Sequence, residues 1–517
     1  MSLPSLGTVL VASALLLVLR FVFRKQSPLS RLPLPPGPSP LPVVGNIKDV
    51  PTSHEWITYA EWAKTYGDVM HISVLGKSLV LLSSLEAARD LLDKKSAVTS
   101  DRPRFTMISD LMGWDWAVQF MGMGPRFRRS RKALHQLLHP QAARDFYGAI
   151  RKGTRSLLRD ILHDPAHFDH HLRHHSGGMM MSILYGEDEG PVRDQYVVKA
   201  EEAVSGLVEA GNVGKFLVDF IPLLKYVPEW MPGAGFQTQA RIWRQMARDM
   251  IEIPYKNLQA AYDRGIAPPS VTTQLINQEL QQSRDGSKDT EFIMGITGVL
   301  YVGGADTALS ALITFMLAMV LNPEKQKRAQ AEIDAVVGHD RLPDFDDRSA
   351  LPYMEHIFSE VLRWYPGVPL GVPHRCMEDI EYKGYRIPEG ATILVNQWAI
   401  LHDEQHYDNP FDFNPDRFVP QEGASAPLDP REASFGYGRR ICPGRHFADD
   451  LLWLMLVNIL AAFDISKPVN ADGKVVEPSG TFISGLVTAL NRSCAGLRRG
   501  MQTSPAFWSL LNDDVLY

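Results

Sequence analysis

One short segment of the chain, residues 435–448, combines residue types that can carry chemistry. It reads FGYGRRICPGRHFA, a glycine-rich loop that leads into a helix and holds a single cysteine, Cys442. The helix dipole and the nearby Arg439, Arg440 and Arg445 are expected to favour the thiolate over the thiol. A thiolate on such a loop can act as a nucleophile, a redox sensor or a metal ligand. A lone cysteine is more often an inert buried residue, so the loop alone leaves these alternatives open.

The cysteine count limits what Cys442 can do. The chain has three cysteines, Cys376, Cys442 and Cys494, and no CxxC pair. Such sparse, unpaired cysteines fit a reducing compartment better than a disulfide-stabilised fold. Special cysteine chemistry in this chain therefore depends on one thiol acting alone.

A second group of reactive residues lies inside the apolar stretch 290–321, which predicts a long helix interrupted at Gly303 and Gly304. Glycine inside a helix costs about 0.5–1 kcal/mol relative to alanine, so a pair of them suggests that something approaches the backbone there. Asp306 and Thr307 follow directly, and an acid beside a hydroxyl can relay protons to a reacting oxygen. The structural alternative is a threonine whose hydroxyl bonds to the carbonyl four residues earlier.

The spacing in the cysteine loop resembles that of a known family. Phe435, Gly438, Arg440, Cys442 and Gly444 match the haem-binding loop of the cytochrome P-450 family at every fixed position. The resemblance implies that Cys442 binds the iron of haem b as a thiolate, which favours cleavage of the O–O bond. It also implies that Phe435 packs beside the sulfur, that the glycines let backbone amides approach it, and that Arg440 pairs with a haem propionate.

Three further residues resemble the family's structural motifs. Glu360 and Arg363 match its ExxR motif, one helical turn apart, and Arg417 lies in its arginine-bearing motif. The resemblance implies that these three form a structural ionic cluster, in which removal of one partner costs about 3–5 kcal/mol.

The same resemblance gives expectations for the other haem contacts. Where the family commonly has WxxxR, this chain has Phe127 and Arg131. Arg131 is therefore expected to meet a propionate, while Phe127 lacks the indole N–H that would donate a second hydrogen bond. Arg375 is expected to be another propionate partner. In this company Asp306 and Thr307 are interpreted as the proton relay.

The resemblance also places a substrate pocket on the side of the haem opposite Cys442. It would be lined by the segment after Asp101, by residues 216–230, and by the residues Val302, Gly303, Leu370, Val372, Phe482 and Ile483. These pieces are mostly apolar, as in a pocket for a small organic molecule. A side chain at Gly303 would project toward the reacting oxygen.

The elements that position these residues are predominantly helical. Residues 69–74 and 78–83 predict a hairpin, 324–337 and 349–364 predict helices, and 380–387 and 392–395 predict short strands. The predicted fold class is mainly α with small β-sheets (α+β). We expect a membrane anchor at 1–25, a proline-rich hinge at 26–46, one catalytic domain at 47–500 and a tail at 501–517.

The N-terminal stretch predicts a single membrane span. The stretch from Leu6 to Phe23 is apolar apart from Arg20. It is long enough to cross a bilayer. A cleaved signal peptide is the alternative, but no basic residue precedes the apolar run. Arg24, Lys25 and Arg31 follow it, which places the body on the cytosolic side, at the endoplasmic reticulum membrane. The net charge of −6 argues against a nucleic-acid partner.

These observations favour a monooxygenase that inserts one oxygen atom from O2 into a small, mostly apolar substrate. The resemblance implies that electrons come from NADPH through a flavoprotein reductase. An acidic surface of that reductase would dock on a basic face formed by Arg128, Arg129, Arg439 and Arg445. A haem-thiolate isomerase or dehydratase, without external electrons, is one alternative, and a haem sensor or electron carrier is another. Several stretches resemble fungal secondary-metabolite hydroxylases, the group that contains O-methylsterigmatocystin oxidoreductase and tryptamine hydroxylase.

Overall fold

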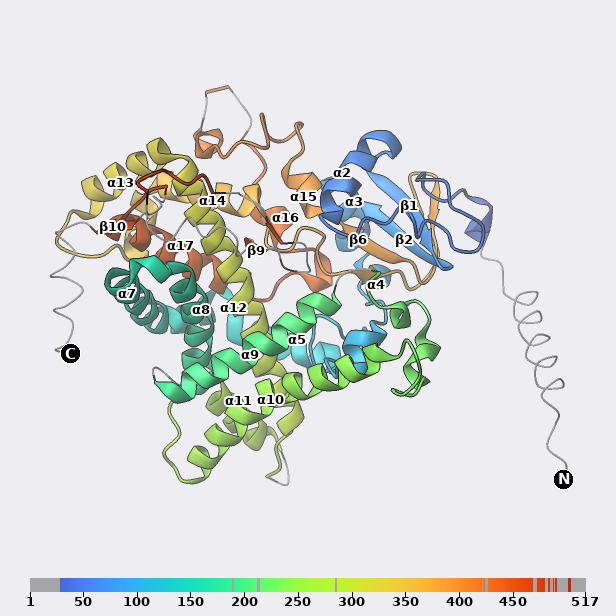
Figure 1. Cartoon of the computed structure of the whole chain (residues 1–517), viewed down its shortest axis with the longest axis horizontal. Helices are drawn as coiled ribbons and strands as arrows, with labels where there is room; N and C mark the ends of the chain where they lie inside the picture. The colour runs from blue at the N-terminus through green and yellow to red at the C-terminus, as the bar shows by residue number, and fades with distance from the viewer. Residues whose placement is uncertain are drawn as a thin grey trace.

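The computed structural model describes residues 28–187, 190–211, 214–283, 286–420, 422–423, 426–467, 472–478, 482–483, 487, 489–490 and 501–503, the strands at 482–483, 489–490 and 501–503 by their backbone only. The predicted membrane anchor at 1–25 lies outside these residues. Helices make up most of the body, and a four-stranded sheet lies toward the right-hand side of Figure 1. The predicted class, mainly α with small sheets, is confirmed.

The largest sheet has the strand order β1-β2-β6-β3. β1 (Val69–Val74) and β2 (Lys77–Leu82) form the predicted antiparallel hairpin. Its turn lies at Leu75 and Gly76, whose φ angles of 49° and 79° are the positive values that a tight hairpin turn requires. β2 then pairs in parallel with β6 (Thr392–Val395), which pairs antiparallel with β3 (His374–Arg375).

Three small two-stranded sheets complete the β structure. They pair β4 (Ile380–Tyr382) with β5 (Tyr385–Ile387), β7 (Phe463–Ile465) with β10 (Met501–Thr503), and β8 (Phe482–Ile483) with β9 (Ala489–Leu490). The pairing of β10 with β7 attaches residues 501–503 to the body. The tail expected at 501–517 therefore begins with a strand that pairs with the folded body.

The proline-rich segment, expected to be a hinge, packs along β1. The His71 amide donates to the Pro36 carbonyl over 2.9 Å, and Gly45 forms a bridge with Val74. A Cβ atom on Gly37 would lie 2.1 Å from the His71 carbonyl oxygen, so only glycine fits this close approach. From about residue 33 onward the segment is part of the folded body.

A long central helix, α12 (Thr290–Leu321), runs through the helical part of the molecule (Figure 1). It packs mainly against α8 (Phe168–Tyr185). Among the described residues, α12 is the one helix that is long and apolar enough to cross a membrane. However, 78% of its most apolar 18-residue stretch is buried inside the protein, as expected for a core helix. The predicted interruption at Gly303 and Gly304 is wrong, because the helix runs through both residues.

The other helices surround α12 or cover the sheet. The longer ones are α2 (Glu55–Tyr66), α5 (Pro125–Leu138), α7 (Tyr147–His163), α9 (Pro191–Ala210), α10 (Gly235–Asp263), α11 (Val271–Gln282), α13 (Pro323–Val337), α14 (Pro352–Trp364) and α17 (Arg445–Ala462). The shorter ones are α3 (Leu85–Ala88), α4 (Ser96–Thr99), α6 (Pro140–Ala143), α15 (Gln397–Leu401) and α16 (Arg431–Ser434).

A buried ionic cluster joins α14 to the segment that precedes the cysteine loop. Arg363 donates from Nε and Nη2 to the two carboxylate oxygens of Glu360, over 2.7 and 2.8 Å, and neither side chain is exposed. Its other three N–H groups donate to the carbonyls of Leu401, Pro410 and Asp412. Since a guanidinium has five N–H groups, all of them are used. The structure also brings Arg417 to Glu360, over 3.2 Å.

Replacing Arg363 with methionine should lower the free energy of unfolding by about 3–5 kcal/mol, because Glu360 would remain buried without its main counter-charge. Urea unfolding of the purified protein measures this. Lys64→Met is the matched control, since the ion pair of Lys64 with Glu61 is mostly exposed and should be worth less than about 1 kcal/mol. Equal losses in the two variants would contradict a structural role for the cluster.

Candidate active site

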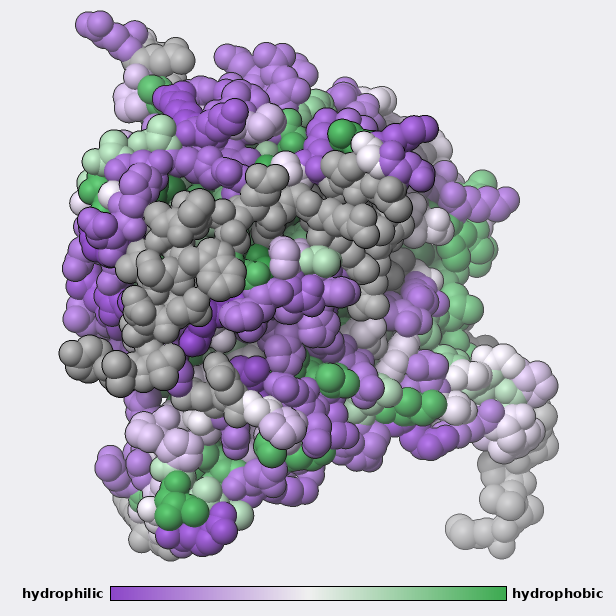
Figure 2. All heavy atoms as spheres, turned by 60° about the vertical axis from the view of Figure 1, so that its left-hand side comes forward, coloured by the Kyte–Doolittle hydropathy of each residue, from purple (hydrophilic) through white to green (hydrophobic). Residues whose placement is uncertain are grey.

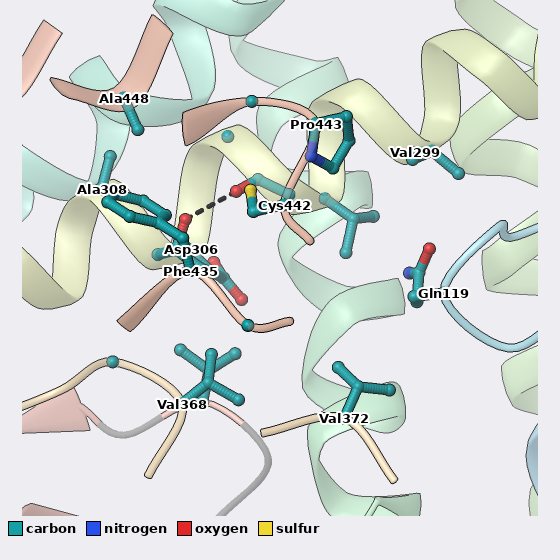
Figure 3. A pocket seen from close by; sticks show the side chains of 18 of the residues that line it. Gln119, Val299, Asp306, Ala308, Val368, Val372, Phe435, Cys442, Pro443 and Ala448 are labelled. Atoms are coloured by element: carbon teal, nitrogen blue, oxygen red, sulfur yellow. Dashed lines mark hydrogen bonds between the residues drawn. The ribbon is translucent and has the colours of Figure 1, made fainter. Parts of the chain in front are cut away.

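Cys442 opens onto a cavity of about 370 Å³ inside the helical part of the molecule. Its walls come from the loop at 118–120, from α5, α8, α9 and α12, from the loop at 366–372, and from the cysteine loop. In Figure 3, Cys442 and Phe435 lie on one side of this space, Asp306 lies beside them, and Val368 and Val372 point into it from another. The structure thus brings the predicted thiol and the predicted acid to one cavity.

The cysteine loop is held by its own backbone. The Cys442 amide donates to the Phe435 carbonyl over 2.8 Å, and α17 begins three residues later, at Arg445. Gly438 has a φ of 54°, and a Cβ atom there would lie 2.1 Å from the Leu92 carbonyl oxygen. A Cβ atom on Gly444 would lie 4.0 Å from the Cys442 sulfur, which is an ordinary contact. Of these two glycines, only Gly438 is required by space.

Burial dominates the ionisation of the thiol. It raises the pKa of Cys442, against the opposing effects of the Gly444 amide and of the charges on Arg131 and Arg445. The surrounding protein alone therefore does not favour the thiolate over the thiol, contrary to the expectation from the sequence. One of the charges that stabilise the thiolate, that of Arg131, comes from α5. Coordination of a metal ion itself displaces the thiol proton, so a high pKa does not prevent Cys442 from becoming a thiolate ligand.

Three guanidinium groups line the cavity without a carboxylate in ion-pair contact within the described part of the chain: those of Arg102, Arg131 and Arg440. Arg102 donates to the carbonyls of Gln119, Val372 and Pro373. Burial, and then the charges of the other two arginines, hold the pKa of Arg102 well below its usual range. Arg131 donates to the Ile441 carbonyl over 2.8 Å. The sequence prediction missed Arg102, whose only signal was its place directly after Asp101.

Arg440 binds the segment 100–121 and rests on an aromatic ring. Its three side-chain nitrogens donate to the carbonyls of Ser100, Val118 and Met121, which leaves two of its five N–H groups. Its guanidinium carbon lies 3.7 Å from the ring centre of Phe127, within cation–π distance. Phe127, at the position of the family's tryptophan, therefore supports Arg440 without donating a hydrogen bond.

The structure does not bring Arg375 to the cavity. Arg375 pairs with Asp101 over 2.9 Å, and its neighbour His374 lines the cavity instead. Adjacent residues of a strand face opposite sides, so if Val372 lies on the cavity wall, residue 374 shares that side and residue 375 does not. The Nδ1 atom of His374 contacts the Thr99 carbonyl at 2.9 Å, and burial keeps the pKa of the ring well below its usual value, so Nε2 is a neutral acceptor.

The two glycines of α12 face different surroundings. A Cβ atom on Gly303 would meet no atom within 4 Å, and Gly303 lines the cavity. A Cβ atom on Gly304 would lie 2.6 Å from the sulfur of Met180 in α8. Gly303 therefore leaves room in the cavity, whereas Gly304 allows α8 and α12 to pack closely.

Asp306 and Thr307 both line the cavity. The Thr307 hydroxyl donates to the Gly303 carbonyl over 2.6 Å, the bond of the structural alternative, and its oxygen lone pairs remain available to accept. Burial raises the pKa of Asp306 to about 6, with Arg173 opposing the shift and Glu201 adding to it. A carboxyl group of this kind exchanges its proton near neutral pH, as a general acid requires.

The rest of the wall is mostly apolar. Val302, Leu370 and Val372 line the cavity as expected. No residue of the segment 216–230 does, among those the structure describes, and the α9 residues Val204, Leu207 and Val208 take that place. Phe482 and Ile483 form β8, but their side chains lie outside the described residues.

The cavity residues fit a haem group. A single thiol faces apolar walls on which three cationic side chains form no ion pair with a described residue, and an iron porphyrin carries one metal ion, an apolar ring and two carboxylates. Cys442 would hold the iron, and Arg102, Arg131 and Arg440 would surround the carboxylates. Buried charges are normally paired, so an anionic group completes this electrostatic arrangement.

Comparisons with known proteins agree with this arrangement. Residues 35–487 match the family model described as Cytochrome P450. The chain is 40% identical over 466 residues to cytochrome P450 monooxygenase 98 of Postia placenta, which covers 90% of this chain and 89% of the relative. It is 41% identical over 446 residues to cytochrome P450 monooxygenase COX2 of Coprinopsis cinerea, which covers 86% and 85%. Cytochrome P450 monooxygenase claR of Ampulloclitocybe clavipes is 39% identical over 459 residues, covering 88% and 84%.

Valine substitutions at the two glycines should separate their roles. Gly304→Val should lower the free energy of unfolding by about 1–3 kcal/mol, because it forces Met180 from its position. Gly303→Val should change it by less than about 1 kcal/mol, since the new side chain enters open space. Urea unfolding measures both, and products formed by the Gly303→Val enzyme should shift in regiochemistry. Equal destabilisation, with unchanged products from Gly303→Val, would remove Gly303 from the substrate cavity.

Proposed function

Because this chain belongs to the cytochrome P450 family, whose members are haem-thiolate monooxygenases, we propose that it inserts one oxygen atom from O2 into a small, mostly apolar organic molecule of fungal secondary metabolism. The electrons would come from NADPH through a flavoprotein reductase. The observation that carries the proposal is the meeting of Cys442, Asp306 and Thr307 on one apolar cavity.

The residues of the chain divide the work of this reaction. Haem bound to Cys442 supplies the site at which O2 is activated. Asp306 holds a transferable proton inside the cavity, and the Thr307 hydroxyl, fixed by its donation to the Gly303 carbonyl, offers its oxygen lone pairs as a hydrogen-bond acceptor beside it. The apolar side chains of Val302, Leu370 and Val372 exclude water and hold the substrate by shape.

An isomerase or dehydratase that uses haem without external electrons is the second candidate. Such an enzyme has no need of an organised proton relay. The buried acid Asp306 and the adjacent hydroxyl of Thr307 on the same cavity wall therefore favour the monooxygenase. A dependence of product formation on NADPH separates the two.

The surface beside the cysteine loop supports docking of an electron donor. Arg128 and Lys132 are exposed on one face of α5, and Arg439 is exposed in the loop itself. Arg129 is also exposed, but its charge is shared with Glu279 and Asp289, over 2.7 and 2.6 Å, so it contributes less to this surface. An acidic reductase surface would meet the remaining cations close to Cys442.

Exposed apolar residues support attachment to the endoplasmic reticulum membrane, with the catalytic domain facing the cytosol. Leu223, Tyr226 and Trp230 are 75%, 74% and 80% exposed, and Val43 is 93% exposed. The Lys77 ammonium donates to the Asp219 carbonyl, and the Leu75 amide donates to the Val44 carbonyl. The segment that leads to residues 223–230 and the segment that holds Val43 therefore both contact the turn between β1 and β2. The described residues on the face shown in Figure 2 are predominantly hydrophilic. The full chain should stay with the membrane pellet after an alkaline wash, and its release would contradict the anchor.

Replacing Cys442 with alanine tests the central proposal. The reduced, carbon-monoxide-bound wild-type protein should show the red-shifted Soret band of thiolate-ligated haem, and Cys442→Ala should abolish it. Cys376→Ala should keep the band, because the Cys376 thiol is fully buried and donates to the Glu378 carbonyl. A Cys442→Ala protein with the band intact would overturn the assignment of the iron ligand.

Replacing Thr307 with alanine tests the proton relay. Haem should still bind, but NADPH oxidation should uncouple from product formation and release hydrogen peroxide, with product falling by about 10²–10⁴-fold, the usual contribution of a positioned acid–base group. Product, peroxide and NADPH are measured in one assay. Omitting the reductase should stop NADPH oxidation, which tests the electron donor. Unchanged coupling in Thr307→Ala would exclude this residue from proton delivery.

A further inference from the structure

One buried carboxamide in the cavity wall has no part in the chemistry described so far. Gln397, the first residue of α15, is 4% exposed and lines the cavity. Its Oε1 atom has no hydrogen-bond partner among the described residues. The adjacent side-chain amide of Asn396 has a partner at both ends, since its nitrogen donates to the Trp56 carbonyl over 2.8 Å and its oxygen accepts from the Ala399 amide over 3.1 Å. The contrast separates a structural amide from an unpartnered one.

The unpartnered amide lies beside the loop that forms an apolar wall of the cavity. A Cβ atom on Gly371 would lie 3.4 Å from the Gln397 Nε2 atom, and the Trp398 amide donates to the Pro369 carbonyl over 3.2 Å. Leu370 and Val372 of this loop line the cavity. A substrate packed against them would therefore come within reach of the Gln397 side chain.

The other polar groups of the wall already have partners or another role. Thr307 donates to a helix carbonyl, His374 contacts the Thr99 carbonyl, and Arg102 and Arg440 bind loop carbonyls. Of the buried polar atoms without a partner in the described part of the chain, two belong to cavity-lining side chains, Gln397 and Tyr437. Tyr437 belongs to the cysteine loop itself. Gln397 is thus the buried polar group left for a bound substrate.

The chemistry of a carboxamide limits what it can recognise. An amide offers both a donor and an acceptor and carries no charge, so it pairs with a hydroxyl or a carbonyl. Native proteins rarely leave a buried amide unpaired, because its desolvation is then uncompensated. An ionised group at this point would bring its own desolvation cost against an uncharged partner.

We propose that Gln397 orients the substrate by hydrogen bonding to one uncharged oxygen group, a hydroxyl or carbonyl, on an otherwise apolar molecule. This rests on the monooxygenase function proposed above and specifies its substrate class, an already oxygenated apolar compound. The bond fixes one end of the substrate against the loop at 368–372 and so decides which carbon faces the reacting centre. The reaction that supplies this substrate must therefore have installed an oxygen function already.

The test uses the haem-loaded protein, the variant Gln397→Met and the probe pair cyclohexanol and cyclohexane. Methionine keeps the length and unbranched shape of glutamine but removes the amide. Dissociation constants come from the probe-induced shift of the haem spectrum and, independently, from the rise in Tm with probe concentration. The preference for the alcohol over the hydrocarbon should fall about three- to tenfold in Gln397→Met, the value of one neutral hydrogen bond. Without probe, the Tm of the variant should rise, because an unpaired buried amide is gone.

Gln119 provides a matched control. It also lines the cavity, but it is only half-buried, so water can serve its amide, and Gln119→Met should leave the preference unchanged. An unchanged ratio in Gln397→Met, failure of cyclohexanol to bind, or a ratio changed only in Gln119→Met would overturn the proposal. A lower Tm or loss of haem from Gln397→Met would also overturn it, since the amide would then serve the fold or the cofactor. The thiolate Soret band in every variant shows separately whether the monooxygenase assignment stands.

Discussion

Three guanidinium groups held in one cavity wall without an ion pair among the described residues are the constraint on which the arrangement of the site depends. Arg102 and Arg440 are fixed by six backbone carbonyls from the segments 100–121 and 372–373. Carbonyl dipoles position a cation but do not cancel its charge, so the wall remains electropositive. These hydrogen bonds join Arg440, two residues before Cys442, to the loops around the cavity. The cations are thereby held in fixed positions at which an anionic group can bind.

The molecule treats a second set of buried charges in the opposite way. In the cluster of Glu360, Arg363 and Arg417, every N–H of Arg363 is used and the carboxylate receives both arginines. Such a closed cluster has nothing left to offer a ligand, and its value is structural, because removing one member strands the others. Partnered charges thus hold the fold, whereas unpartnered ones mark where a ligand belongs.

The sequence predicted those features that depend on local pattern. The hairpin at 69–82, the helix at 290–321 and the cysteine loop could be identified because alternation, apolar length and fixed spacing are visible in the chain. Arg375 was misplaced because a motif gives position but not the side of a strand, and Arg102 was missed because its partners are backbone carbonyls, which carry no sequence signal. The helix at 290–321 proved continuous because Gly303 and Gly304 meet an open cavity and a neighbouring helix, and neither requires a break.

The substrate wall was the least predictable part for a related physical reason. An apolar residue in a cavity and an apolar residue in the core look alike in sequence, since both are excluded from water. Only the packing distinguishes Gly303, which adjoins empty space, from Gly304, which adjoins Met180. Adjacent positions of one helix therefore differ in what a substitution costs. Side chains can be added at the cavity-facing position while α8 and α12 keep their contact, so the shape of the cavity can change without a change of fold.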